Sequence, residues 1–215
     1  MKKYNTIIML FVVCIITGSF FGQEANSKTI FSEKNLENAL LHPEKVIRLD
    51  LGNQKLNLET LDLSPFINLE YLSLENDNLK EFPKGLNSLK KLKTLDLSGN
   101  SFKNLPSNFS ELTSLEELFL NNEKNFNLQD NIFILSKLPS LYRLHLENDK
   151  LKKLPSEINL LKNLKYLYLN NNKFKKFPLQ IQGLQQLQFL DLKDNFIKQD
   201  EIDVLPLNFG FQINL

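Results

Sequence analysis

The sequence lacks several residue types on which common fold classes depend. Its 215 residues include 1 cysteine, no tryptophan, 2 histidines, 2 alanines and 4 valines. A single cysteine, Cys14, excludes a disulfide framework and a cysteine metal site. So few alanines argue against an ordinary helical bundle, and so few valines argue against a standard parallel sheet of buried Val and Ile runs. The core must therefore be built in another way.

The charges are nearly balanced, which excludes two further classes. The chain carries 26 basic and 25 acidic residues, a formal net charge of +1 and a hydrophobic fraction of 42%. These values do not fit binding to nucleic acid through bulk positive charge, and they do not fit disorder. We therefore expect no specific nucleic-acid partner. The abundant residues are leucine and asparagine, with 45 and 27 copies.

The first 22 residues have the pattern of a secretory signal peptide. Lys2 and Lys3 give a positive start, and residues 6–21 are then apolar or small without a charge. This stretch is shorter than the roughly 20 residues that a membrane-spanning helix needs. Gly22 provides a small residue for cleavage before Gln23, so we assign residues 1–22 to a signal peptide.

Two other readings of the N-terminus stay open. Phe20 is bulky for a position three residues before a cleavage site, so the segment could remain as an uncleaved membrane anchor. A lipoprotein anchored at Cys14 is less favoured, because Val13 is large for the small residue usual there. Cleavage would leave an exported chain without cysteine, which favours a bacterial envelope. We expect a secreted, periplasmic or cell-surface protein.

A repeat of 23 residues organises most of the chain. Frames of the pattern L-x-x-L-x-L follow one another at steps of 23 residues, with one step of 26. They begin at Val46, Leu69, Leu92, Leu115, Leu141, Leu164 and Leu187. The clearest pair is LKTLDLSGNSFKNLPSNFSELTS and LKYLYLNNNKFKKFPLQIQGLQQ. The pattern resembles the leucine-rich repeat family, in its form with L-P-x-x-I-x-x-L that bacterial secreted members carry.

The resemblance implies an α/β solenoid. It would be a curved right-handed coil with a short parallel sheet on its concave face and 3₁₀ or irregular turns on its convex face. The residues support this independently, because L-x-L has the period of a strand whose leucines point to one side. Stacked strands of this kind can share one leucine core. We divide the chain into an N-terminal helical cap (23–45), seven repeats (46–199) and a C-terminal cap (200–215).

Three details can be tested in a structure. Ser32 is placed to cap the first helix, and Pro43 to end it. The fourth repeat carries the three extra residues, so we expect a bulged return loop between Asn125 and Ile134. The ninth repeat position is a mixture of Asn with Asp, Glu and Gln. Because ionised carboxylates accept but do not donate hydrogen bonds, we expect a leakier polar ladder there than an all-Asn repeat would form.

Nothing in the sequence suggests catalysis. The histidines His42 and His145 lie about four repeats apart, and no Gly-rich phosphate loop, H-E-x-x-H or G-x-S-x-G motif is present. His145 and Glu147 share a face, but two ligands do not make a metal site. We therefore expect a protein that is not an enzyme and that has no cofactor and no bound metal.

The residues that point away from the leucines form the candidate ligand-binding face. In the C-terminal strands they are mainly aromatic, whereas the N-terminal strands carry polar or acidic residues such as Ser73. The candidate ligand-binding residues are Phe119, Arg143, His145, Tyr166, Tyr168 and Phe189. Aromatic residues gathered in one patch are typical of binding hot spots. The alternative is that they pair across strands and serve stability alone.

A row of lysines is the second candidate. One repeat position carries Lys80, Lys103, Lys152, Lys175 and Lys198. Such a row could form an edge for an anionic partner, although a ridge that keeps a leucine-rich protein soluble is the more common reason for it.

The sequence thus predicts a non-enzymatic binding module that recognises a protein or peptide, or a glycan, on its concave face. The resemblance implies protein binding most often. The alternative is a structural or adhesion component of the envelope that acts as a rigid spacer. We expect a monomer that contacts a membrane only through a retained N-terminus.

Overall fold

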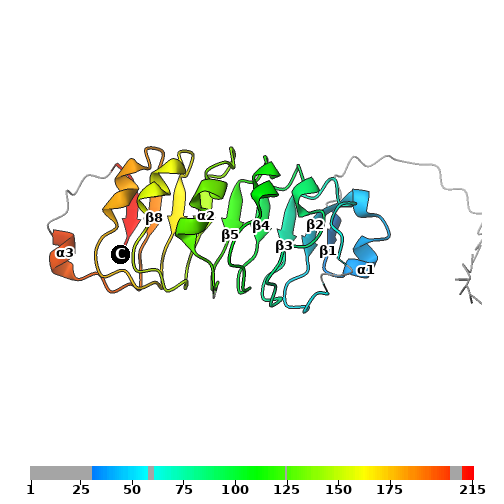
Figure 1. The fold of residues 1–215 in the computed structure, drawn as a ribbon, viewed down its shortest axis with the longest axis horizontal. Helices are drawn as coiled ribbons and strands as arrows, with labels where there is room; N and C mark the ends of the chain where they lie inside the picture. Colours follow the sequence, from blue (N-terminus) through cyan, green and yellow to red (C-terminus); the bar gives the residue numbers. More distant parts are fainter. Residues whose placement is uncertain (1–30, 58–60, 124, 204–209) are drawn as a thin grey trace, which may run out of the picture.

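The computed structural model describes residues 31–57, 61–123, 125–203 and 210–215 (Figure 1). They form the predicted curved solenoid, with one sheet of nine parallel strands in sequence order. The strands are β1 (Phe31–Glu33), β2 (Val46–Asp50), β3 (Tyr71–Ser73), β4 (Thr94–Asp96), β5 (Glu117–Phe119), β6 (Arg143–His145), β7 (Tyr166–Tyr168), β8 (Phe189–Asp191) and β9 (Gln212–Asn214). The predicted signal peptide, with Cys14, lies outside the described residues.

The register of the sheet follows the repeat in the sequence. Tyr71 pairs with Thr94 and Thr94 pairs with Glu117, each one repeat further along the chain. The pairing of Glu117 with Arg143 spans the longer step without shifting the register. The three extra residues are therefore absorbed outside the sheet, and the outward-pointing side chains stay in continuous rows.

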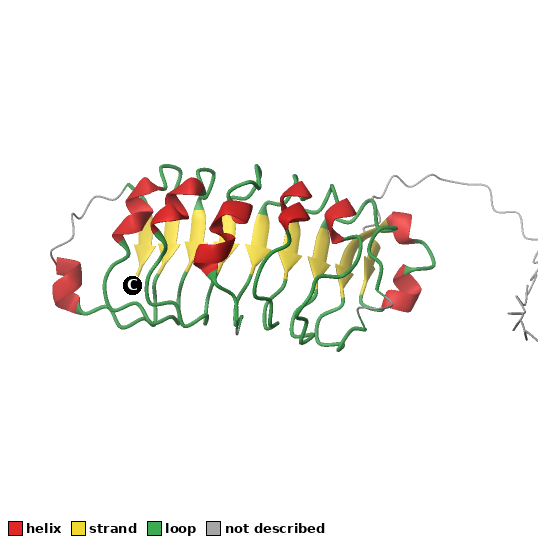
Figure 2. Cartoon of the chain, viewed as in Figure 1, coloured by secondary structure: helices red, strands yellow, loops and turns green. Residues whose placement is uncertain are grey.

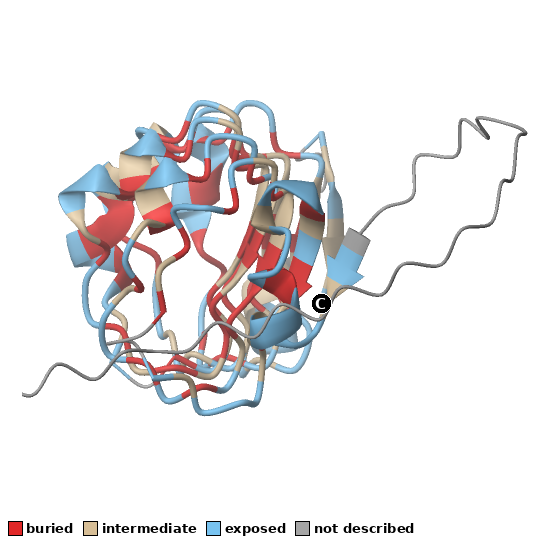
Figure 3. Cartoon of the chain, turned by 90° about the vertical axis from the view of Figure 1, so that its right-hand side faces the viewer, coloured by how far each residue is buried: buried red, intermediate tan, exposed pale blue. Residues whose placement is uncertain are grey.

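The core is a stack of leucines between the sheet and the opposite face. Leu72, Leu95, Leu118 and Leu144 are all fully buried, as are the leucines two residues after each of them. An end-on view shows the buried residues between the strands on one side and the helical turns on the other (Figure 3). Because each three-residue strand shares this core only with its neighbours, the solenoid is stabilised by contacts between successive coils.

Short helices cover the convex face, opposite the sheet (Figure 2). Four of them are the expected 3₁₀ turns: η2 (Leu86–Ser88), η3 (Ser107–Glu111), η4 (Ser156–Leu160) and η5 (Leu179–Gly183). Pro106 and Pro155 immediately precede η3 and η4, where a fixed φ directs the chain into the turn.

The fourth repeat differs from the prediction. Its return path is not a bulged loop but an α-helix, α2 (Leu128–Leu135). Asn127 caps α2 by accepting a hydrogen bond from the backbone N–H of Gln129. The extra residues lengthen the turn into a regular helix, whose Leu128, Ile132 and Leu135 join the core.

The N-terminal end also differs in detail. Ser32 does not cap a helix, because it lies in strand β1. The cap of α1 (Leu36–Ala39) is Asn35, which accepts a hydrogen bond from the N–H of Asn38. Pro43 begins a 3₁₀ turn, η1 (Pro43–Lys45), which leads into β2. At the other end, α3 (Gln199–Asp203) precedes β9, which pairs with β8.

A polar ladder runs along the edge where the strands end. Side-chain oxygens at the ninth repeat position accept backbone N–H groups of the preceding coil. The residues that accept are Asp77, Asn100, Glu123, Asp149, Asn172 and Asn195. Among the described residues at this position, only the amides of Asn100, Asn172 and Asn195 donate in turn to leucine carbonyls. The ladder is thus continuous for acceptors and interrupted for donors, as the mixture of residue types predicted.

The abundance of asparagine has a second cause that sequence reasoning missed. The eighth repeat position has a positive φ in all seven repeats. Its residues are Asn53, Asn76, Gly99, Asn122, Asn148, Asn171 and Asp194. Asn, Asp and Gly adopt this left-handed conformation at the lowest cost. Asparagine is therefore frequent after the strands because every coil turns there through a residue with a positive φ.

Candidate functional site

The sheet brings the six predicted ligand-binding residues together on its concave face. They come from four neighbouring strands, β5 to β8, and stand on either side of the buried leucines Leu118, Leu144, Leu167 and Leu190. Because parallel strands lie about 4.8 Å apart, equivalent side chains on adjacent strands are in contact.

The four rings of Phe119, His145, Tyr168 and Phe189 follow one another across the strands and form what we call the aromatic row. The rings of Phe119 and His145 are stacked with centroids 3.9 Å apart and an angle of 16° between their planes. His145 and Tyr168 are stacked at 4.2 Å and 5°. Tyr168 and Phe189 are tilted at 51° with centroids 5.5 Å apart. The row is therefore a preformed aromatic surface held by cross-strand pairing.

His145 is fixed within the row by two carboxylates. Its Nε2 lies 3.1 Å from Oε1 of Glu117, and its Nδ1 lies 3.2 Å from Oε1 of Glu147. Both faces of its ring are covered by Phe119 and Tyr168, so only 9% of the residue is exposed. We expected His145 to be an accessible contact. The structure instead makes it a largely buried support for the two rings on either side.

A second row runs beside the first and positions Arg143. Its guanidinium donates to Oε1 of Glu117 at 3.3 Å and lies 4.8 Å from the ring centroid of Tyr166. The Tyr166 hydroxyl donates to Oε1 of Gln188 at 3.0 Å. Arg143 therefore has a fixed conformation, with 31% of its side chain still accessible. A guanidinium held in this way offers the N–H donors of its accessible nitrogens to a ligand at little entropic cost, whereas its Nε is buried.

Tyr168 offers the row a free polar group. Its hydroxyl makes no hydrogen bond to any other described residue. The oxygen is not fully buried, so a ligand can reach it. Burial of the ring raises the pKa of the Tyr168 phenol, so the group stays neutral and can both donate and accept.

The N-terminal half of the same face has a different character. Arg48 covers the ring of Tyr71, with the guanidinium carbon 3.7 Å from the ring centroid. Ser73 is only 3% exposed and offers little to a ligand. Burial raises the pKa of the Glu75 carboxyl, with the nearby Asp96 adding to the shift. This half belongs to the same sheet and, among the described residues, has no stacked rings, so it serves as an internal control.

The predicted basic edge splits into two parts. Lys80, Lys103, Lys152, Lys175 and Lys198 are all exposed, as their common repeat position requires. Lys152 and Lys175 also line a hollow on the flank of the C-terminal repeats, whereas Lys80, Lys103 and Lys198 do not line it. Phe196, which also lines this hollow, was not singled out from the sequence.

Among the described residues, no group of three or more His, Cys, Asp or Glu side chains is arranged to hold a metal ion. The two ring nitrogens of His145 point at different carboxylates, which leaves no common point for a cation. None of the helices that the structure describes is long and apolar enough to cross a membrane.

Comparison with known families agrees with this geometry. A model described as "Leucine-rich repeat region" matches residues 25–142, which is more than half of the chain. The chain belongs to the leucine-rich repeat family. A second model, described as "Leucine rich repeat", matches residues 139–197 of this leucine-rich repeat protein. A comparison with curated protein sequences found no significant match.

Solved structures show the same fold. A leucine-rich repeat protein of Leptospira interrogans is 31% identical with a TM-score of 0.58; the match covers 78% of this chain and 48% of the other. Toll–Spatzle from Drosophila matches with 21% identity and a TM-score of 0.60, over 77% of this chain and 23% of the other. The TLR13–ssRNA13 complex matches with 26% identity and a TM-score of 0.59. This match covers 80% of this chain and 26% of the other. This leucine-rich repeat chain thus spans about half of the length of the Leptospira protein and about a quarter of the length of each of the other two chains.

Proposed function

We propose that this protein is a non-enzymatic binding module that recognises a protein or peptide segment on the concave face of its repeats. The observation that carries the proposal is the aromatic row, flanked by the preorganised Arg143. Tyrosine and arginine in fixed positions are the residues in which binding energy concentrates. The free hydroxyl of Tyr168 adds a polar group that nothing in the described part of the chain uses.

The stacking itself favours a protein or peptide over a glycan. Sugars pack against open aromatic faces, but the faces inside this row cover one another at 3.9 and 4.2 Å. What the row presents is a ridge of ring edges beside a guanidinium, which suits apolar side chains and carbonyl oxygens. The row is smaller than the roughly 800 Å² that each partner buries in a standard interface. A short segment of a partner would therefore fill it.

The structural relatives support this class of function. One matching structure is Toll in its complex with Spatzle, and another is the TLR13–ssRNA13 complex. The second includes RNA, but the concave face here combines Arg143 and Arg48 with several carboxylates, which does not favour a polyanion. We also propose that the N-terminal segment exports the chain to the envelope or beyond.

A capture experiment tests the binding proposal. The protein is immobilised and exposed to envelope extract and growth medium, and retained proteins are identified by mass spectrometry. The variants are Tyr168→Ala and Tyr71→Ala, which remove similar half-buried tyrosines from the two halves of the same face. A partner retained by the wild type and by Tyr71→Ala, and lost by Tyr168→Ala, supports the proposal.

Two results count against it. A partner lost equally from both variants would show that the aromatic row has no special role. If no saturable partner is found while the protein stays bound to the envelope, the role of a rigid spacer is favoured. Export is tested separately by N-terminal sequencing, and full-length chain in the soluble cytoplasm would reject it.

A further inference from the structure

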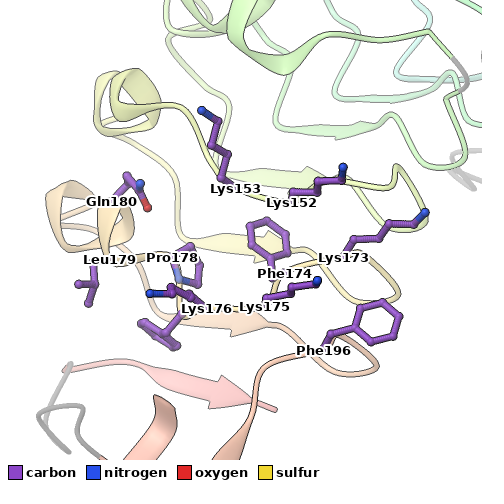
Figure 4. A pocket seen from close by; sticks show the side chains of 11 residues that line it. Lys152, Lys153, Lys173, Phe174, Lys175, Lys176, Pro178, Leu179, Gln180 and Phe196 are labelled. Atoms are coloured by element: carbon purple, nitrogen blue, oxygen red, sulfur yellow. The ribbon is translucent and has the colours of Figure 1, made fainter. Parts of the chain in front are cut away.

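A hollow of about 960 Å³ lies on the flank of the C-terminal repeats, away from the concave face (Figure 4). Five lysines line it, and we call it the lysine-rimmed hollow. They are Lys152, Lys153, Lys173, Lys175 and Lys176. The volume is at the upper end of the range for small-molecule sites.

Its base is apolar. Phe174 and Phe177 are buried side chains of the core that face the hollow. Phe196 and Leu179 stand at its margin and are 62% and 51% exposed. Large apolar side chains are costly to leave in water when they gather around a concave surface. The hollow therefore has exposed apolar side chains at its margin as well as a positive rim.

The positive charges are largely uncompensated. No ion pair within the described residues involves Lys152, Lys153, Lys173 or Lys175, and no carboxylate lines the hollow. Lys176 approaches Glu201 only at 4.0 Å, with both side chains exposed. Like charges on adjacent coils repel each other. An anion placed among them would relieve this repulsion and gain charge-assisted hydrogen bonds.

The sequence shows that this arrangement is local. Two successive repeats carry the same pattern, K-L-K-K-L-P from residue 150 and K-F-K-K-F-P from residue 173, whereas the second and third repeats have N-L-K-E-F-P and S-F-K-N-L-P. A hollow of about 310 Å³ beside Phe82 and Phe109 is lined by a single lysine, Lys84. The concentration of charge thus coincides with the larger hollow and is not a property of every repeat.

We propose that the lysine-rimmed hollow binds a monomeric amphiphile that carries a phosphate group. The phosphate lies among the ammonium groups of Lys152, Lys175 and their neighbours, and the apolar chain lies against the exposed ring of Phe196. A phosphate monoester carries close to two negative charges and three strong acceptor oxygens. It therefore matches a lining whose side-chain polar groups are five ammonium groups and the amide of Gln180.

The lining argues against a peptide as the occupant. Each peptide residue brings an N–H donor that needs an acceptor when it is buried. Among the described residues that line the hollow, the only side-chain acceptor is the amide oxygen of Gln180. The concave shape also favours a single molecule over a membrane surface, which would need apolar side chains on a protruding face. An amphiphile with one anionic head and an apolar tail satisfies all the lining groups.

The test is isothermal titration calorimetry of the full chain with dodecyl phosphate below its critical micelle concentration. Inorganic phosphate and dodecylphosphocholine serve as comparisons, because each lacks either the apolar chain or the net negative charge. The charge variant is Lys152→Gln with Lys175→Gln. Its matched control is Lys80→Gln with Lys103→Gln, which removes the same charge at the same repeat position outside the hollow.

The apolar margin of the hollow is tested by Phe196→Ser. The control is Phe133→Ser, because Phe133 is similarly exposed, at 58%, on helix α2. We expect dodecyl phosphate to bind about tenfold more weakly to Lys152→Gln/Lys175→Gln than to the wild type. Its affinity for the two controls, Lys80→Gln/Lys103→Gln and Phe133→Ser, should stay within about twofold of the wild-type affinity. Phe196→Ser also weakens binding. Thermal melts confirm that each variant is folded.

Four results would overturn the proposal. Equal weakening by both lysine pairs would mean attraction by overall charge. Inorganic phosphate binding as tightly as dodecyl phosphate would mean that the apolar base is not used. An unchanged affinity of Phe196→Ser for dodecyl phosphate would mean that the apolar chain does not contact Phe196. Binding to vesicles of phosphatidylglycerol without binding of the monomer would identify a membrane-docking surface instead.

Discussion

Asp149 is an acid in a position of the polar ladder that suits an amide. Its Oδ1 accepts the backbone N–H of Glu123 at 2.9 Å, while its Oδ2 is buried and has no hydrogen-bond partner among the described residues. Burial raises the pKa of the Asp149 carboxyl from 3.8 to about 8, with Glu123 and Glu147 adding to the shift. The folded protein therefore holds a proton on Asp149 at neutral pH, where the unfolded chain has released it.

The sign and size of the effect follow from this shift. Because the pKa is higher in the folded state, the stabilisation is complete below about pH 4 and is lost as the pH rises towards 8. Between these limits the free energy of unfolding falls by about 1.4 kcal/mol per pH unit through this group. Asp149→Asn removes the titration and supplies a permanent donor. The free energy of unfolding of Asp149→Asn, relative to that of the wild type, should therefore rise by about 2.7 kcal/mol from pH 5 to pH 7.

Urea unfolding followed by far-ultraviolet circular dichroism at pH 5, 6 and 7 measures this difference. Asp200→Asn is the control, because it makes the same chemical change at an exposed carboxylate. The difference between Asp149→Asn and wild type should widen with pH, while that between Asp200→Asn and wild type stays flat. A constant difference for Asp149→Asn would refute the reasoning, since Asp149 would then be ionised in the folded protein.

Three further changes test the ladder and the turns by chemical denaturation. Asn100→Ala removes a fully buried side chain that forms hydrogen bonds with backbone groups of two coils. It should lower the free energy of unfolding by about 3 kcal/mol or more. The control is Asn104→Ala, which changes an exposed residue and should alter the free energy of unfolding little. Gly99→Ala places a Cβ against the side chain of Asn76 at a φ of +71° and should cost about 1–3 kcal/mol. Asn131→Ala frees the N–H of Leu105 and should cost about 1–3 kcal/mol.

Each of these has a result that would contradict it. An unchanged midpoint for Asn100→Ala would mean that water replaces its bonds and that the ladder is not a closed network. A neutral Gly99→Ala would mean that the left-handed turn can rearrange. A neutral Asn131→Ala would mean that α2 is not tied to the third repeat through Asn131.

The repeat made the fold predictable from the sequence. Seven frames fix which leucines point inward, and the pairing of Tyr71 with Thr94 and of Tyr166 with Phe189 follows from their equal positions in the frame. Helix α2 was missed, although Asn127 followed by Asp130 is a usable helix-start signal. Strand β1 was missed because Phe31–Glu33 has no counterpart in the repeat.

The shared face of the candidate site residues was predictable, and their contacts with one another were less so. The frame placed Phe119, His145 and Tyr168 on one face, but it could not show that their rings stack and bury His145. Stacking depends on side-chain conformations that a repeat pattern does not specify. The lysine-rimmed hollow depends on how successive coils pack on the flank of the solenoid. The repeat pattern therefore showed lysines that line it but did not show that Phe196 joins them.

The central claim is that ligand binding depends on the aromatic row of the concave face. Calorimetric titration of a captured partner against wild type, Tyr168→Ala, Tyr168→Phe and Tyr71→Ala tests it most directly, with thermal melts as the control for folding. We expect Tyr168→Ala to weaken binding by on the order of 1–3 kcal/mol, Tyr168→Phe to lose part of this through the missing hydroxyl, and Tyr71→Ala to bind as the wild type does. Equal affinities for the wild type and Tyr168→Ala would contradict the claim.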